Sequence, residues 1–224
     1  MLGLCRARGT VNGEVKDLNY GKVTSAALDP IEKKPLAEFM PGSTILSIGS
    51  YGCNFKCGFC QNSSISMCGP EASYDTHTPE ELVKAALQLR RQGNIGIAYT
   101  YNEPLIGWEF VRDTAALIHD VGLRNVVVTN GYINRGPLEE LLPRIDAFNI
   151  DLKSFSEAFY KRIGGDLETV KQSIEICAQS SHVEVTTLII PGLNDSDEEM
   201  DALAGWLAGV SPQIPLHITR FFPR

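Results

Sequence analysis

The 224-residue sequence predicts an α/β fold in which six strands alternate with helices around an open (β/α)6 barrel. Short apolar runs rich in β-branched residues recur along the chain, and helical segments with their own start or stop signals separate them. Polar side chains follow the ends of these runs, as they do at the carboxyl edge of a parallel sheet. Right-handed crossovers curl such a sheet in one direction, and six units fall short of a closed eight-stranded barrel, so we expect a partial TIM barrel.

Thr78 and Glu81 form a predicted capping box at the start of one helix, and Ser196 and Glu199 form another. Strands are expected at 44–48, 95–100, 123–129, 146–152, 183–190 and 214–219. Helices are expected at 78–91, 104–121, 137–142, 156–162, 167–178 and 196–207.

Residues 1–43 are polar, rich in glycine and poorly periodic. Asn12-Gly13 favours a tight hairpin turn between two short extended pieces. We therefore divide the chain into an N-terminal lead-in at 1–43, partly β, that covers one edge of the fold, and a core domain at 44–224. Cys5 is expected to be a free thiol of the lead-in.

Composition excludes several classes of protein. The formal net charge of -7 argues against a broad nucleic-acid-binding surface, which needs clustered Lys and Arg. No apolar run reaches the roughly 18 residues of a membrane span, and the first residues lack the apolar stretch of a secretory signal. Six cysteines in a chain without such a signal indicate metal binding more than disulfides. The expected location is the cytoplasm, and the expected state is a monomer.

Three of the cysteines, Cys53, Cys57 and Cys60, stand at C-x3-C-x2-C spacing in one loop after the first core strand. A structural zinc site takes four protein ligands, and a [4Fe–4S] cluster usually takes four thiolates, one for each iron. Three thiolates therefore leave one iron open to a ligand that is not protein. The alternative is a structural zinc site completed by a distant His or Cys.

The polar residues at the expected strand ends include a carboxylate, Glu103, and an ammonium, Lys153, which suit a zwitterionic amino-acid ligand that also carries hydroxyls. Asp151 and Lys153 are two apart, so they point to the same side of extended backbone. Simpler alternatives exist for each: Glu103 as a carboxylate at a helix start, and Asp151 with Lys153 as a structural ion pair. The combination favours a ligand site.

A C-x3-C-x-aromatic-C motif after an early strand resembles the radical S-adenosylmethionine (radical SAM) superfamily. The wider sequence resembles the radical SAM proteins similar to pyruvate formate-lyase activating enzymes, in particular the radical SAM component of the AmmeMemoRadiSam group. The runs that carry this resemblance are Asp-Pro-Ile-Glu-Lys-Lys-Pro-Leu at 29–36, Pro-Gly at 41–42, Ser-Ile-Gly at 47–49, Gly-Cys-Asn at 52–54 and Phe-Cys-Gln-Asn at 59–62.

The resemblance implies two cofactors, a [4Fe–4S] cluster and S-adenosylmethionine bound to its open iron. It implies reductive cleavage into methionine and a 5'-deoxyadenosyl radical that abstracts hydrogen from a substrate, with no catalytic side chain beyond these cofactors. A glycyl-radical enzyme or another polypeptide is the expected substrate, and a low-potential flavodoxin or ferredoxin is the expected electron donor. The alternatives are a small metabolite as substrate, or a module without catalysis that carries electrons on an iron–sulfur cluster or binds zinc.

The resemblance also implies roles for individual residues. Glu103 takes the methionyl ammonium, and Lys153 takes the carboxylate or a ribose oxygen. Asp151 and Asn130 contact the ribose. The full set of expected cofactor-binding residues is Phe59, Asn102, Glu103, Thr129, Asn130, Asp151, Lys153 and Ile190, with Phe59 and Ile190 against the adenine.

Three positions depart from the activating enzymes. Val128 stands where they have an Asp of a monovalent-cation site, Thr186 where they have an Arg, and Phe222 where they have a His. After the last expected strand only 220–224 remain, too few for two more βα units. We therefore expect a macromolecular substrate to close the open side of the barrel.

Overall fold

The computed structural model describes residues 1–223, and over this range the main sheet has seven strands in the order β11-β10-β9-β8-β7-β5-β4. All neighbouring pairs are parallel except β4 with β5. The six parallel strands are the six predicted ones, so the predicted fold class is confirmed. The strands are β4 (Ser25–Pro30), β5 (Thr44–Gly49), β7 (Asn94–Tyr99), β8 (Arg124–Thr129), β9 (Ala147–Asp151), β10 (His182–Ile189) and β11 (Leu216–Arg220).

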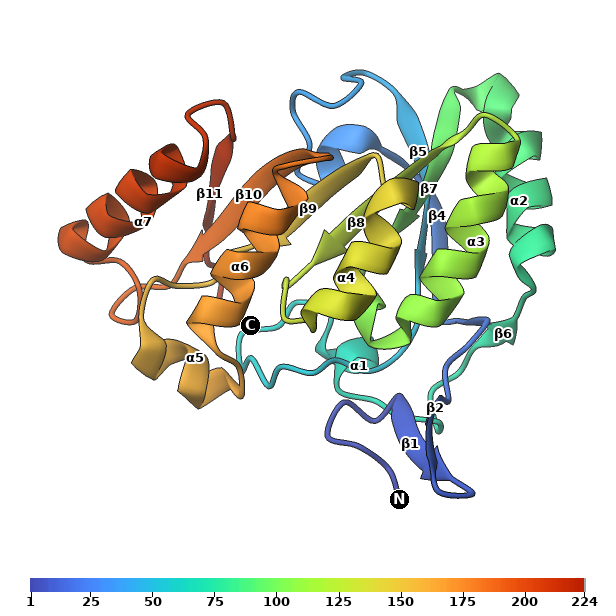
Figure 1. Ribbon diagram of the computed structural model, residues 1–224, viewed down its shortest axis with the longest axis horizontal. Helices are drawn as coiled ribbons and strands as arrows, with labels where there is room; N and C mark the ends of the chain where they lie inside the picture. The colour runs from blue at the N-terminus through green and yellow to red at the C-terminus, as the bar shows by residue number, and fades with distance from the viewer. Residues whose placement is uncertain (224) are drawn as a thin grey trace.

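The helices α2, α3, α4 and α6 cover one face of this sheet, and α7 lies beyond β10 and β11 at the far edge (Figure 1). Core residues such as Ile97, Val127 and Phe148 point to the helix-covered face and are fully buried. The helices are α1 (Ser63–Ser66), α2 (Pro79–Gln88), α3 (Trp108–Asp120), α4 (Arg135–Leu141), α5 (Glu157–Ile163), α6 (Leu167–Cys177) and α7 (Asp197–Val210), with 3-10 turns at Ile31–Lys33, Leu89–Gln92, Pro104–Gly107 and Leu142–Arg144.

The two predicted capping boxes differ in outcome. At α2, Glu81 N–H donates to the Thr78 hydroxyl (3.3 Å) and Thr78 N–H donates to the Glu81 carboxylate (3.0 Å), so this box is confirmed. At α7, Ser196 accepts from Glu199 N–H (3.2 Å), but the Glu199 carboxylate does not return to Ser196. It accepts hydrogen bonds from the loop after β9 instead, including Phe155 N–H at 2.7 Å. The second box is therefore wrong, because a tertiary contact takes the carboxylate.

The lead-in is partly β, as predicted. Asn12 and Gly13 have φ of 52° and 83°, the left-handed pair of a tight hairpin turn between β1 (Arg8–Val11) and β2 (Glu14–Asp17). A short pair, β3 (Lys22–Val23) with β6 (Asp75–Thr76), follows. Because β4 pairs with β5 along its whole length, the lead-in supplies the edge of the main sheet. The division of the chain at residue 43 stays a prediction.

Residues 31–39, which we call the barrel plug, lie against the face of the sheet that the helices leave uncovered (Figure 1). Ile31 and Leu36 are fully buried there. The Asn149 amide donates to the carbonyl of residue 35 at 2.9 Å. Glu184, on β10, accepts from the backbone N–H of residues 37 and 38, each at 2.9 Å. Buried backbone N–H and C=O groups need hydrogen-bond partners, and these bonds supply them. They hold the plug in place as the floor of the open barrel.

One buried carboxyl in the lead-in gives a stability prediction. Burial raises the pKa of Asp17 to about 6 from 3.8, and its Oδ2 has no hydrogen-bond partner within residues 1–223. The folded state therefore favours the protonated form of Asp17. The stability gained from binding this proton is complete below pH 4 and is lost as the pH rises through 6. Asp17→Asn should raise the free energy of unfolding at pH 8 by on the order of 1–3 kcal/mol and change little at pH 3.5.

Denaturant unfolding at both pH values checks this expectation. Asp201→Asn, at an exposed position on α7, is the matched control and should show no pH-dependent gain. A parent and an Asp17→Asn variant of equal stability at pH 8 would contradict the assignment.

Candidate active site

A cavity of about 370 Å³ opens at the carboxyl ends of the parallel strands, between the cysteine loop and the barrel plug. It gathers residues of β8, β9, β10 and β11 and of the loops that follow β5 and β7, which lie far apart in the sequence. Ile190 is not among its lining residues: it is 5% exposed, and its N–H donates to the Asn194 side chain at 2.7 Å. The predicted site residues that do line the cavity are Cys53, Cys57, Phe59, Cys60, Asn102, Glu103, Thr129, Asn130, Asp151 and Lys153.

The cysteine loop follows β5 directly, and two features shape it. Gly52 has φ of 89°, and a Cβ there would lie 2.4 Å from the carbonyl oxygen of Cys5, so only glycine allows this close approach. Phe55 is 1% exposed and packs on Tyr132, with ring centroids 5.3 Å apart. In Figure 1 the loop, drawn in cyan, and α1 lie below the strand ends. The loop is thus anchored by a buried ring between its first two motif cysteines.

The donor set fits a cluster with one open iron. Cys53, Cys57 and Cys60 are all free thiols on the cavity wall, and no histidine and no fourth cysteine lines it. Across residues 1–223 no three His, Cys, Asp or Glu side chains are close enough to hold a single metal ion. In a cluster each thiolate binds a different iron, which spaces the sulfurs more widely than one ion does.

Burial keeps the thiols of Cys53 and Cys57 neutral when no metal is bound. It raises the pKa of Cys53 to about 12, helped by the nearby Glu103, and the pKa of Cys57 to about 11. Thiolate, not thiol, is the form that ligates metal, so metal binding has to release these protons.

Glu103 is almost completely buried, and its carboxylate joins the ends of β7 and β8. Its Oε1 accepts from the Thr129 hydroxyl (2.6 Å) and from Leu105 N–H (3.0 Å), and its Oε2 accepts from Asn130 N–H (2.7 Å). Burial raises the pKa of Glu103 to about 7, although these hydrogen bonds lower it and Asp151 raises it further. Glu103 therefore caps the 3-10 turn after β7, as the simpler alternative proposed, while its carboxylate also faces the cavity.

Asp151 and Lys153 form an ion pair with 3.0 Å between Oδ2 and Nζ. Burial lowers the pKa of Lys153, but the charge of Asp151 and the hydrogen bond to it raise that pKa, so the side chain stays charged. The Lys153 side chain is 19% exposed and the Asp151 side chain 35%. Both therefore remain within reach of a ligand in the cavity.

Two asparagines connect these groups to the cysteine loop. Asn130 Nδ2 donates to Asn54 Oδ1 at 2.8 Å and lies 3.8 Å from Cys53 Sγ. Asn102 accepts from Ser50 N–H at 2.9 Å, and its amide donates to backbone carbonyls of residues 51–52. Asn102 thus fixes the start of the cysteine loop, a positioning role that sequence reasoning did not anticipate.

The barrel plug supplies a wall of the cavity that was not predicted from the sequence. Lys34 is 2% exposed, and its Nζ donates to Asp29 Oδ2 at 2.9 Å. The same carboxylate oxygen also accepts from the Tyr101 hydroxyl at 2.6 Å. Tyr101 has φ of 71°, a left-handed conformation that non-glycine residues rarely adopt. Lys33, Lys34 and Tyr101 all line the cavity. A sequence signal existed, since 29–36 was part of the recognised run, but no spacing rule places a lead-in segment inside a barrel.

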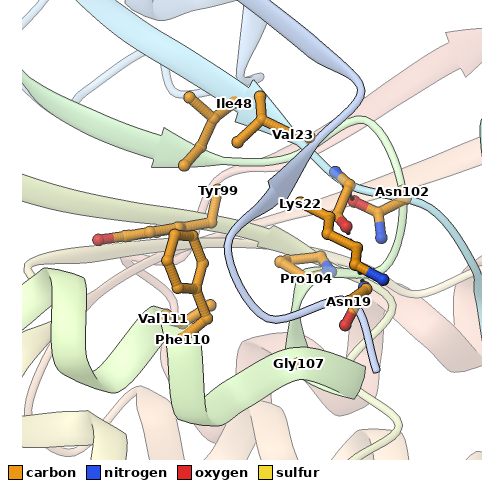
Figure 2. A pocket seen from close by; sticks show the side chains of 12 residues that line it. Asn19, Lys22, Val23, Ile48, Tyr99, Asn102, Pro104, Gly107, Phe110 and Val111 are labelled. Carbon is orange, nitrogen blue, oxygen red and sulfur yellow. Dashed lines mark hydrogen bonds between the residues drawn. The ribbon is translucent and has the colours of Figure 1, made fainter. Parts of the chain in front are cut away.

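A small pocket of about 40 Å³ lies between the lead-in and the sheet (Figure 2). Apolar side chains such as Val23, Ile48 and Phe110 occupy one side of it, and Asn19 and Lys22 lie at the other. Ligand sites usually measure about 300–1,000 Å³, so this pocket is a packing space between β3, β5 and α3.

The fold and the site together define a class: a partial TIM barrel that presents three free cysteines, a carboxylate and a lysine in one cavity at its strand ends. The sequence model of the Radical SAM superfamily matches residues 47–207 of this chain, which is well over half of its length. The chain belongs to the radical SAM superfamily. Membership implies a [4Fe–4S] cluster and S-adenosylmethionine as cofactors and cleavage of S-adenosylmethionine as the chemistry.

Curated relatives fall into two groups. An uncharacterised protein of Methanocaldococcus jannaschii is 40% identical over 224 residues, which cover 99% of this chain and 66% of that protein. Pyruvate formate-lyase 1-activating enzyme of Escherichia coli K12 is 25% identical over 164 residues, covering 68% of this chain and 63% of that protein. Benzylsuccinate synthase activating enzyme of Thauera aromatica is 27% identical over 187 residues, covering 81% and 56%. The chain spans less than two thirds of the length of these relatives.

Solved structures agree on the fold. Streptococcus suis SuiB bound to S-adenosylmethionine has a TM-score of 0.62 at 13% identity, covering 80% of this chain and 42% of that one. Methylornithine synthase (PylB) has a TM-score of 0.57 at 17% identity, covering 84% and 56%. Within residues 1–223, no helix is both long enough and apolar enough to cross a membrane.

Proposed function

We propose that this protein is an activating-type radical SAM enzyme that abstracts hydrogen from a polypeptide, with a glycyl-radical enzyme as the expected substrate. One observation carries the proposal: a single cavity brings the three loop cysteines together with Glu103, Asn130, Asp151 and Lys153. When bound, the reduced cluster and S-adenosylmethionine supply methionine and a 5'-deoxyadenosyl radical that takes hydrogen from the substrate.

The chain's own residues bind and orient. Cys53, Cys57 and Cys60 would hold the cluster. Glu103, preorganised by three hydrogen bonds, would accept from the methionyl ammonium, and Lys153 would donate to the carboxylate or to a ribose oxygen. A charge-assisted hydrogen bond in a buried site is among the stronger polar contacts. Glu103 and Lys153 would therefore fix the two ends of the methionyl group.

Further contacts belong to the same proposal. Asn130 and Asp151 would contact the ribose. Phe59, on the cavity wall, and Ile190, outside the lining, would lie toward the adenine. Thr129 and Asn102 would act indirectly, because their side chains bond Glu103 and the loop backbone. Thr186 lines the cavity where the activating enzymes have an Arg, and its hydroxyl is bonded to the buried Asn149.

A polypeptide substrate is supported by two considerations. The relatives from E. coli and T. aromatica are named as enzymes that activate another enzyme. The cavity of about 370 Å³ is in the range that one drug-sized ligand fills. The cluster and S-adenosylmethionine would therefore occupy it. A substrate would then have to reach them from the open side of the barrel. A protein loop can close that side while it presents a hydrogen. A low-potential flavodoxin or ferredoxin as donor, a cytoplasmic location and a monomeric state are parts of the proposal.

Deuterium transfer tests the substrate class. Without a partner, the reduced protein should cleave S-adenosylmethionine slowly. Addition of the labelled glycyl-radical enzyme partner should raise turnover and carry deuterium from the polypeptide into 5'-deoxyadenosine, measured by mass spectrometry. Label that arrives from a free metabolite, at full rate and with no protein present, would contradict a polypeptide substrate.

A further inference from the structure

The side chain of Asn130, just past the end of β8, reaches the sulfur of the first motif cysteine. Asn130 is 4% exposed, and its Nδ2 lies 3.8 Å from Cys53 Sγ and 2.8 Å from Asn54 Oδ1. A side-chain amide carries two N–H donors, so one is available to each of these acceptors. Cys53 Sγ also accepts from the backbone N–H of Phe55 at 3.3 Å. Two N–H groups therefore point at one sulfur that would hold the cluster.

Backbone groups of Tyr132 fix which way the two amides are turned. Asn130 Oδ1 accepts from Tyr132 N–H at 2.9 Å, and Asn54 Nδ2 donates to the Tyr132 carbonyl at 2.7 Å. Because a backbone N–H only donates and a carbonyl only accepts, neither amide can turn over without losing a bond. The NH2 group of Asn130, and not its oxygen, therefore faces the sulfur. We call Asn54 and Asn130 the amide clamp.

The segments that carry both donors are anchored. The backbone N–H of Asn130 donates to Glu103 Oε2 at 2.7 Å. The ring of Phe55 is buried and packs on the ring of Tyr132, so the two loops that meet at Cys53 also hold each other. A donor that is held in place before negative charge develops costs no reorganisation when that charge appears. The geometry around Cys53 is therefore suited to stabilise added negative charge on its sulfur.

The simpler explanation is that the amide clamp only ties the cysteine loop to the end of β8. The bonds among Asn54, Asn130 and Tyr132 would be enough for such a tie. They do not account for the second N–H of Asn130, which is directed at Cys53 and not at solvent. Asn130 also lines the cavity at the strand ends, the strand-end cavity, and one lone pair of its Oδ1 remains for a ribose hydroxyl. The two roles of Asn130 are therefore compatible.

We propose that the amide clamp sets the reduction potential of the cluster, with the Asn130 N–H donating to the thiolate of Cys53 and Asn54 holding the Asn130 amide in that orientation. The inference rests on the proposed function, since it assumes a cluster on the three motif cysteines. Reduction transfers one electron from the electron donor to the cluster and raises the negative charge on its cysteine sulfurs. Hydrogen bonds to those sulfurs favour the reduced form and raise the potential. Asn54 and Asn130 are positioning residues in this role, because they act through Cys53.

Redox titration of the cluster-loaded protein without S-adenosylmethionine tests the amide clamp. The variants are Asn130→Ala and Asn54→Ala. Their midpoint potentials are measured by electron paramagnetic resonance, and their Fe–S(Cys) stretching frequencies by resonance Raman spectroscopy. The control is Asn102→Ala. Asn102 also fixes the cysteine loop, through Ser50 N–H and backbone carbonyls of residues 51–52, but within residues 1–223 none of its hydrogen bonds reaches a cysteine sulfur.

Asn130→Ala should shift the balance between reduced and oxidised cluster about tenfold towards the oxidised form, which lowers the potential of a one-electron couple by about 59 mV. Asn54→Ala should shift it in the same direction by less, because the Asn130 amide keeps its bond to Tyr132 but loses the partner that orients its NH2 group. A hydrogen bond draws charge from the sulfur and weakens the Fe–S bond, so the stretching frequency should rise in both variants. Asn102→Ala should keep the parent potential.

A parent potential in Asn130→Ala would overturn the proposal, as would an equal drop in Asn102→Ala. If Asn130 contacted only the ribose, Asn130→Ala would bind S-adenosylmethionine more weakly and would keep the parent potential in its absence. Should Asn130→Ala take up too little iron for a titration, Asn54→Ala decides the question, and a parent potential in that variant would overturn the proposal.

The outcome is separable from the proposed function. If the dithionite-reduced parent failed to cleave S-adenosylmethionine, the proposed function would be wrong, while the potentials of the cluster-loaded variants would still report on the amide clamp. If cleavage proceeded normally and the potentials did not differ, only the amide clamp would be wrong.

Discussion

Replacing Cys57 with serine is expected to abolish assembly of the [4Fe–4S] cluster and with it all cleavage of S-adenosylmethionine. Cys57 is 8% exposed and lines the strand-end cavity, and the alcohol of serine does not ionise to replace a thiolate ligand. With three thiolates as the proposed ligands, loss of one would remove a third of the protein ligands of the cluster. Anaerobic iron and sulfide analysis and the visible absorption of the reconstituted protein measure the loss. Cys53→Ser and Cys60→Ser should behave in the same way.

The chain provides its own controls. Cys68 lies outside the motif, and its thiol donates to the Ser64 carbonyl at 2.7 Å, a bond that serine can keep. Cys5 is a free thiol of the lead-in. Cys68→Ser and Cys5→Ser should retain full iron and sulfide content. A normal cluster spectrum in Cys57→Ser would show that the assignment of the three ligands is wrong.

The second large effect is expected for Glu103→Gln. The parent carboxylate accepts at both oxygens, from Leu105 and Thr129 at one and from Asn130 at the other. An amide puts an NH2 group opposite one of these donors, which should lower the free energy of unfolding by about 1–3 kcal/mol. Loss of the negative charge opposite the methionyl ammonium should weaken S-adenosylmethionine binding by roughly ten- to a hundredfold. Thermal unfolding and equilibrium dialysis measure the two effects.

Glu109→Gln separates these effects. Glu109 forms a two-bond ion pair with Arg8 at 2.6 and 2.7 Å, and it does not line the strand-end cavity. That variant should lose stability and keep its affinity for S-adenosylmethionine. Cluster content should stay normal in both variants, because no hydrogen bond of either glutamate reaches a cysteine. If Glu103→Gln bound S-adenosylmethionine as tightly as the parent, the role of Glu103 as a ligand would be contradicted.

The strands and the cysteine loop were predictable because their signals are local. Apolar runs, caps such as Thr78 with Glu81, and a three-cysteine spacing depend on neighbours in the sequence, and right-handed crossovers then bring the strand ends together. For this reason ten of the predicted site residues line one cavity. The individual cofactor contacts stay predictions.

What the sequence did not predict depends on distant contacts. The carboxylate of Glu199 was expected to complete a helix cap. It accepts instead from the N–H of Phe155, in a loop 44 positions earlier in the chain. The plug was assigned to an edge, whereas buried bonds from Asn149 and Glu184 hold it inside the barrel. Neither partner carries a local signal, because each looks like an ordinary polar residue in a strand.

The barrel plug has a consequence for synthesis of the chain on the ribosome. The N–H of Ala37 bonds Glu184, 147 positions later, so the floor of the barrel cannot be completed until β10 has emerged. Until then the backbone N–H groups of residues 37 and 38 lack their acceptor, although Ile31 and Leu36 already have apolar partners on β5, β7, β8 and β9. A nascent chain stalled before β10 should therefore be cut by proteases near residues 37 and 38, and translation past residue 184 should make this part of the plug resistant.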